Sequence, residues 1–141
     1  MEKKILCEEN IVLGARCQDR WEAIRMCGKI LLDQGYIKES YIDDMLEREK
    51  SASVYVGNHI AIPHGIAYSE KNILHSGISV LQLPEGVDFG QEKAYLMIGI
   101  AGKDGTHVDL LSRIALACME EDNVERMWKA RDKQVILNIL G

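Results

Sequence analysis

The feature that most constrains the fold of this chain is an almost unbroken apolar run over Ala94–Ala101. Such a run is typical of a strand covered on both faces, as in a sheet with helices packed against each side. The turn Gly102–Gly105 follows directly. A helix is predicted after that turn, because apolar residues recur there at helical spacing: Val108, Leu111, Ala115 and Cys118, with Leu110 and Ile114 beside them.

Two further helices are predicted in the first third of the chain. Asp19 and Glu22 have the spacing of a capping box, and apolar residues follow them at helical spacing until Gly35. A second helical pattern begins near Tyr41 and runs into Arg48-Glu49-Lys50.

Short β-type segments are predicted around these helices. Ile11–Leu13 is expected to form an edge or first strand, and Val54–Val56 and Ile60–Ile62 form two more. A further strand is predicted over Gly77–Leu83, and we expect Pro84-Glu-Gly86 to end it.

The last part of the chain predicts two short helices. Asp122 and Glu125 resemble another capping box, and Asp132 can cap a final helix. Helices before and after a cluster of strands, with one strand covered on both faces, favour an α/β fold. We therefore predict a three-layer α/β/α sandwich with a central mixed β-sheet flanked by helices.

Length and charge exclude several classes of protein. The chain has 141 residues, which fits one domain spanning residues 1–141. Its net charge is −5, and no segment combines lysine and arginine with aromatic residues, so a nucleic-acid binder is not expected. The apolar runs are too short to span a bilayer, and Glu8, Glu9 and Asn10 interrupt the apolar run that a signal peptide needs. A cytoplasmic protein without direct membrane insertion is predicted.

The cysteines and most histidines give weak signals. Four cysteines without metal-ligand spacing favour free thiols, although an even number leaves two disulfides open: Cys7, Cys17, Cys27 and Cys118. His59 and His75 are expected to be structural, in or beside strands. A zinc site formed by His59, His64 and His107 is the alternative, but no compact spacing supports it. No metal and no cofactor are therefore predicted.

His64 is the first candidate for chemistry. It follows a predicted strand and stands between Pro63, which fixes the backbone, and Gly65, which lets the chain turn without a Cβ clash. This arrangement would present an imidazole on a rigid backbone to a partner protein. On these residues alone, a turn histidine without a function remains the alternative.

His107 and Arg48 are the other candidates. His107 falls in the first turn of a predicted helix, where unpaired N–H groups and the helix dipole favour an anion such as a phosphoryl group. The Arg48 guanidinium matches phosphate oxygens, although an ion pair with Asp44 one helical turn earlier would equally explain it.

Together these segments resemble the mannitol/fructose-type enzyme IIA family of the phosphoenolpyruvate-dependent phosphotransferase system, most closely its mannitol branch. The resemblance extends from Ile11 to the C-terminal helix. It depends on five motifs: Gly35-Tyr-Ile, Met45-Leu-Glu-Arg48-Glu-Lys50, Gly57-Asn-His-Ile-Ala-Ile-Pro-His64-Gly65, Pro84-Glu-Gly-Val-Asp-Phe-Gly90 and Thr106-His107.

The resemblance implies a role for each candidate. His64 matches the phosphorylated histidine, His107 the second active-site histidine, and Arg48 the active-site arginine. The family accepts phosphate from the phosphocarrier HPr and passes it to a cysteine of a IIB domain, so the resemblance implies a phosphotransferase component for mannitol, another hexitol or fructose. The end of the chain at Gly141 leads us to expect a free-standing IIA. The alternative is a regulatory, phosphorylation-dependent binding module of the nitrogen type.

Overall fold

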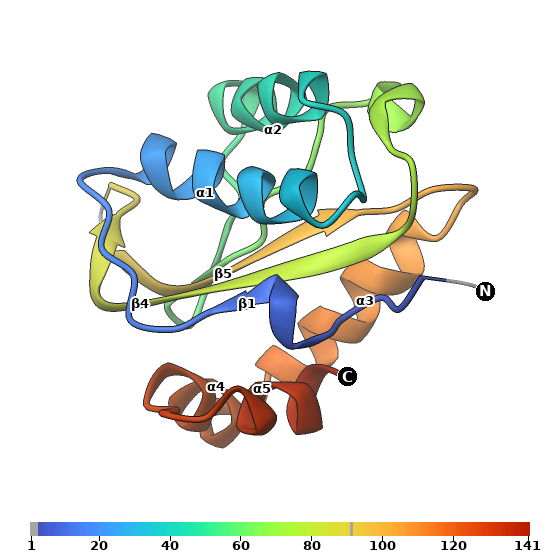
Figure 1. Ribbon diagram of the computed structural model, residues 1–141. Helices are drawn as coiled ribbons and strands as arrows, with labels where there is room; N and C mark the ends of the chain where they lie inside the picture. Colours follow the sequence, from blue (N-terminus) through green and yellow to red (C-terminus); the bar gives the residue numbers. More distant parts are fainter. Residues whose placement is uncertain (1–2, 91) are drawn as a thin grey trace.

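The computed structural model describes residues 3–90 and 92–141 and contains a five-stranded mixed sheet between two layers of helices (Figure 1). Two helices cover one face of the sheet and three cover the other. The predicted three-layer α/β/α sandwich is confirmed.

The helices are α1 (Arg20–Asp33), α2 (Ser40–Ser51), α3 (His107–Cys118), α4 (Glu121–Trp128) and α5 (Lys133–Leu140), with 3-10 turns η1 (Glu8–Asn10) and η2 (Ser69–Asn72). The strands are β1 (Ile11–Val12), β2 (Tyr55–Gly57), β3 (Ile60–Ala61), β4 (Gly77–Asp88) and β5 (Lys93–Ala101). Their order in the sheet is β1-β4-β5-β3-β2. The β1–β4 and β3–β5 pairs are parallel, and the β4–β5 and β2–β3 pairs are antiparallel.

Local capping signals predicted two helix starts correctly. The Asp19 carboxylate accepts a hydrogen bond from the Glu22 N–H at 2.8 Å and begins α1. The Asp132 carboxylate likewise accepts from the Gln134 N–H at 2.8 Å and begins α5. Gly35, with a φ of +82°, follows α1 in the left-handed conformation that ends many helices.

The predicted end of β4 at Pro84 is wrong, because the strand continues to Asp88. β1 pairs with β4 only at Val80 and Leu81, so the missing N–H of Pro84 interrupts no ladder on that side. On the β5 side the register shifts between Gln82 and Val87. Proline is tolerated at such an irregularity, and the strand bends there rather than ending.

Two predictions for the C-terminal helices also need correction. α4 begins at Glu121 after Glu120, without a side-chain cap, so Asp122 lies within the first turn instead of capping the helix. In α3 the predicted apolar stripe is divided. Its buried side consists of Leu110, Ile114 and Cys118, whereas Val108 and Ala115 are exposed.

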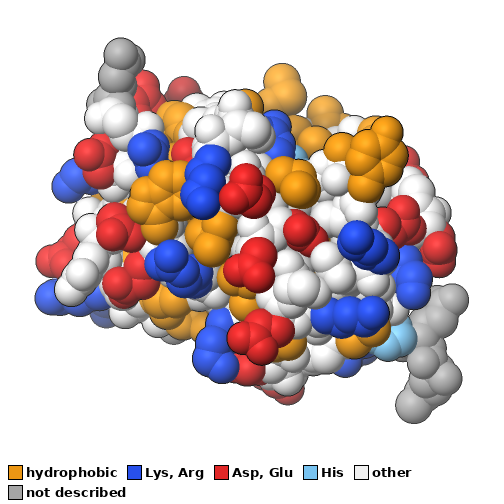
Figure 2. All heavy atoms as spheres, turned by 90° about the horizontal axis from the view of Figure 1, so that it is seen from above, with side chains coloured by type: hydrophobic (Ala, Val, Ile, Leu, Met, Phe, Trp, Pro, Cys, Tyr) orange, Lys and Arg blue, Asp and Glu red, His pale blue; other side chains and the backbone are white. Residues whose placement is uncertain are grey.

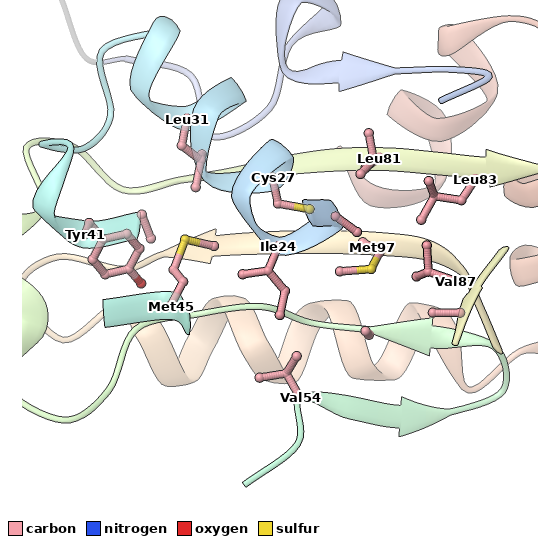
Figure 3. Close-up of a cluster of buried hydrophobic side chains, with 14 of the residues drawn as sticks. Ile24, Cys27, Leu31, Tyr41, Met45, Val54, Leu81, Leu83, Val87 and Met97 are labelled. Carbon is pink, nitrogen blue, oxygen red and sulfur yellow. The ribbon is translucent and has the colours of Figure 1, made fainter. Parts of the chain in front are cut away.

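Alternate side chains of the sheet contribute to two cores, one against each helical layer. The core beneath α1 and α2 includes Ile24, Leu31, Met45 and Met97 (Figure 3). The opposite core joins β5 to α3, α4 and α5. The buried strand predicted over Ala94–Ala101 is therefore confirmed, since β5 contributes to both cores.

The outer surface of α1 and α2 has interspersed charged and apolar side chains (Figure 2).

The state of the cysteines and the lengths of the helices agree with the sequence-based expectations of free thiols and of apolar runs too short to span a bilayer. All four cysteines are free thiols, and burial raises the pKa of Cys118 to about 11. A thiol held protonated in this way is a poor nucleophile. Among residues 3–90 and 92–141, every helix is too short or too polar to cross a bilayer.

Candidate active site

The carboxyl ends of two parallel strands bring the two histidine segments together. β3 and β5 run side by side, and the Ile100 N–H donates to the Pro63 carbonyl at 2.9 Å. His64 follows Pro63 directly, while β5 leads through the loop Gly102–Thr106 into α3, which begins at His107. Strand ends of this kind are where α/β sheets place their chemistry.

The His64 ring is held by a hydrogen bond to the backbone two residues earlier in the chain. Its Nδ1 lies 2.7 Å from the Ile62 carbonyl oxygen. A carbonyl can only accept, so Nδ1 has the proton and the neutral ring has its lone pair on Nε2. The side chain is half-buried, and this burial is the main cause that lowers its pKa below the usual 6.5, with contributions from His107 and Arg48. The ring is therefore neutral at physiological pH, with one nitrogen free.

His107 lies beside this ring. The two ring centroids are 5.0 Å apart and the ring planes are inclined by 52°. Burial lowers the pKa of His107 as well. Gly102 permits the close approach of this segment, because a Cβ at that position would collide with the His107 backbone. His107 is the first residue of α3, where backbone N–H groups lack partners within the helix.

Arg48 approaches from α2. Its guanidinium donates to the Ala52 carbonyl at 2.6 Å, which uses one N–H of its five. Within the part of the chain that the structure describes, Arg48 forms no ion pair with Asp44, whose carboxylate accepts from the Asn72 amide at 2.7 Å instead. The described residues therefore do not contain the ion pair with Asp44 that would have given Arg48 a purely structural role.

One pocket joins the three predicted residues. It has a volume of about 320 Å³ and is lined by Arg48, His64 and His107, together with Tyr41, Tyr68 and Glu70 among others. A guanidinium and a helix N-terminus beside a neutral imidazole make a site suited to an anion. The three segments are distant in sequence, and the fold brings all three together as expected.

The comparisons with known proteins agree with this geometry. Residues 4–141 match the family described as "Phosphoenolpyruvate-dependent sugar phosphotransferase system, EIIA 2". The chain belongs to this family. It is 52% identical to the mannitol-specific phosphotransferase enzyme IIA component of Geobacillus stearothermophilus, over 100% of this chain and 98% of that protein.

Two further proteins extend the comparison. The chain is 44% identical to the mannitol-specific enzyme IIA component of Bacillus subtilis (strain 168), covering 98% of this chain and 97% of that protein. It is also similar to enzyme IIA in the complex of mannitol enzyme IIA with phosphorylated mannitol enzyme IIB from Escherichia coli. That chain superposes with a TM-score of 0.90 at 36% identity, over 96% of each chain. This chain is an enzyme IIA component of the phosphotransferase system.

The remaining histidines of this enzyme IIA chain lie outside the pocket. His59 precedes β3, and its Nδ1 lies 3.0 Å from the Lys93 carbonyl near the start of β5. His75 is exposed and follows η2. Because His59 and His64 flank opposite ends of β3, the zinc site considered for His59, His64 and His107 is not formed. Among residues 3–90 and 92–141, no group of three potential ligands could hold a metal.

Two tyrosines that line the pocket were not singled out as functional candidates in the sequence. Tyr41 is buried and its position fits the apolar pattern of α2, so the sequence indicates only a core residue. Tyr68 is 95% exposed with a φ of +66°. Tyr41 reaches the pocket only through the tertiary fold, whereas Tyr68 is four residues after His64 in the sequence and belongs to none of the motifs.

Proposed function

We propose that His64 carries a phosphoryl group from phospho-HPr to a cysteine of a IIB domain during mannitol uptake. The observation that supports this most is the bond from Nδ1 to the Ile62 carbonyl, which leaves Nε2 as the free nucleophile in the pocket. Nε2 attacks phosphorus, and the N–P bond forms as the bond to the donor breaks. The cysteine thiolate then attacks, so the S–P bond forms as the N–P bond breaks.

The residues around His64 fit the electrostatic demands of this transfer. Phosphoryl transfer depends on in-line positioning and on stabilisation of charge on the transferring oxygens. Arg48 and the start of α3 at His107 supply positive potential to the same pocket. Loss of one such donor typically costs about 3 kcal/mol of transition-state stabilisation. We assign Arg48 and His107 this role, with His64 as the phosphorylated residue.

Relatives support mannitol as the sugar. The Geobacillus and Bacillus proteins, 52% and 44% identical over almost the whole chain, are mannitol-specific components. The Escherichia coli homologue forms a complex with phosphorylated mannitol enzyme IIB. We extend both properties to this chain. Residues 1–141 would act as one IIA unit in the cytoplasm, where HPr and IIB can reach it in turn.

An exposed apolar surface beside the pocket fits partner docking. Tyr68 lines the pocket, and Val108, which follows His107, is 66% exposed. Ala115 lies on the same side of α3 at helical spacing, and Met119, directly after the helix, is 74% exposed. Exposed apolar patches of this kind mark interaction surfaces. Because both partners need access to Nε2, we propose that they bind this surface one after the other.

The test is a complete relay with purified proteins. Phosphoenolpyruvate, enzyme I and HPr should label the chain, and a mannitol IIB domain in excess should become labelled at a rate proportional to the amount of IIA. Catalytic amounts of a His75→Ala variant should support the same rate, because His75 lies outside the pocket. A chain that accepts phosphate without passing it to IIB would instead be a regulatory module.

A further inference from the structure

The phenol of Tyr41 connects the segment after β3, which contains His64, to the end of β5, the strand that leads to His107. Its hydroxyl accepts from the Gly65 N–H at 2.8 Å and donates to the Ile100 carbonyl at 2.8 Å. Gly65 follows His64, and Ile100 lies two residues before the loop that leads to His107. One oxygen atom therefore joins the segment after β3 to the end of β5.

The Tyr41 ring is fixed tightly in this position. The side chain is 1% exposed and lies at one end of the core cluster beneath α1 and α2 (Figure 3). A Cβ at position 65 would lie 2.6 Å from Cε1 of Tyr41, so glycine is needed there for the ring to approach. Burial raises the pKa of Tyr41 to about 12, which keeps the hydroxyl protonated and able to donate. Movement of the ring is therefore restricted, and so is movement of the loop.

The same helix also positions the guanidinium. Tyr41 and Arg48 are two turns apart in α2 and both line the pocket. Ile100 is linked to the His64 segment directly, because its N–H donates to the Pro63 carbonyl, and indirectly, because its carbonyl accepts from the Tyr41 hydroxyl that also binds Gly65. Without the hydroxyl, Gly65 would lose its acceptor, and the link from Gly65 through Tyr41 to β5 would be lost, whereas the backbone bond at Pro63 would remain.

We propose that Tyr41 is a positioning residue that fixes the direction of His64 Nε2 through the Gly65 N–H and the Ile100 carbonyl. It does not touch the phosphoryl group. This inference depends on the proposed function, because it assigns the direction of the nucleophile in that transfer. In-line transfer is sensitive to displacements of about 1 Å, which can lower a rate by about 100-fold.

The experiment compares two tyrosine-to-phenylalanine variants. Tyr41→Phe keeps the ring and removes both bonds, and we expect the maximum rate of transfer from phospho-HPr to fall about 10- to 100-fold. The HPr concentration at half-maximal rate should change less than about twofold, since the docking surface is untouched. Tyr36→Phe is the matched control. Tyr36 is also 1% exposed, and its hydroxyl bridges the Asn10 amide and the Lys4 carbonyl away from the pocket.

Each result has a defined meaning. Equal rates in wild type and Tyr41→Phe would overturn the inference and leave the proposed function intact, whereas wild-type protein without label on His64 would refute the proposed function. The inference would also be overturned if Tyr41→Phe and Tyr36→Phe lost the same share of the transfer rate, in proportion to their losses of thermal stability. Independently of any variant, the Gly65 amide of the wild type should be protected from hydrogen exchange. Rapid exchange in the folded protein would contradict the Tyr41 bond.

Discussion

β3 has a histidine at each end, and the two differ in surroundings rather than in local bonding. His59 precedes the strand and His64 follows it closely. In both, Nδ1 lies within 3.0 Å of a backbone carbonyl, of Lys93 for His59 and of Ile62 for His64. Both rings therefore have Nε2 free when they are neutral.

What surrounds the free nitrogen separates the two ends. His59 is exposed, has a left-handed φ of +64°, and packs edge-on against Tyr95 with ring centroids 5.2 Å apart. His64 is half-buried beside His107 in the pocket that Arg48 also lines. The comparison shows that an imidazole whose Nδ1 is bound to a backbone carbonyl is not sufficient to form an anion site. At the carboxyl ends of β3 and β5, a guanidinium and a helix start lie beside the imidazole.

The largest predicted effect separates the two histidines directly. His64→Ala should abolish labelling by phospho-HPr, because the nucleophile is lost, whereas His59→Ala should keep the labelling rate within about twofold. Incorporation of radioactive phosphate under identical conditions measures both. Persistent acid-labile label on His64→Ala, or its loss from His59→Ala, would break the comparison.

A smaller loss is predicted when the guanidinium is removed and His64 is kept. Arg48→Ala should lower the transfer rate about 100- to 1,000-fold, because one donor to the transferring oxygens is lost. Arg113→Ala is the control, since Arg113 also donates to a backbone carbonyl, that of Leu140 at 2.8 Å, but lies outside the pocket. Single-turnover rates should fall only for Arg48→Ala. Equal rates in the two variants would remove Arg48 from the site.

The smallest predicted effect is a pH dependence. Burial lowers the pKa of His64 and His107 below 6.5, so the unfolded chain takes up protons before the folded one as the pH falls. These residues therefore stabilise the fold fully above pH 6.5, and that contribution declines as the pH drops from 6.5 towards the folded pKa values. Denaturant unfolding at a series of pH values measures this, with the His64→Asn, His107→Asn double variant as control. An NMR titration midpoint for His64 above 6.5 would contradict it.

Local signals predicted the fold well where the physical cause is itself local. Asp19 and Asp132 cap their helices through residues two or three positions away, so sequence spacing contains the information. Pro84 did not end β4, because the end depends on the length of β1 and on the register with β5. The exposure of Val108 likewise depends on which side of α3 packs against the sheet.

The site shows the same division. The motifs around His64, His107 and Arg48 identified three residues that the fold brings into one pocket. Tyr41 escaped detection, because a buried tyrosine at helical spacing has the pattern of a core residue. Its hydroxyl binds Gly65 and Ile100, which are 24 and 59 positions away along the chain, so only the tertiary structure reveals these contacts.

The central claim is that Nε2 of His64 is the nitrogen that receives the phosphoryl group. The direct measurement is NMR of the chain with heavy nitrogen in its histidine rings, after labelling by phosphoenolpyruvate, enzyme I and HPr. We predict one phosphoryl group, with phosphorus–nitrogen coupling to Nε2 of His64 and with Nδ1 still protonated. Coupling to Nδ1 of His64, or to either nitrogen of His59 or His107, would contradict the account.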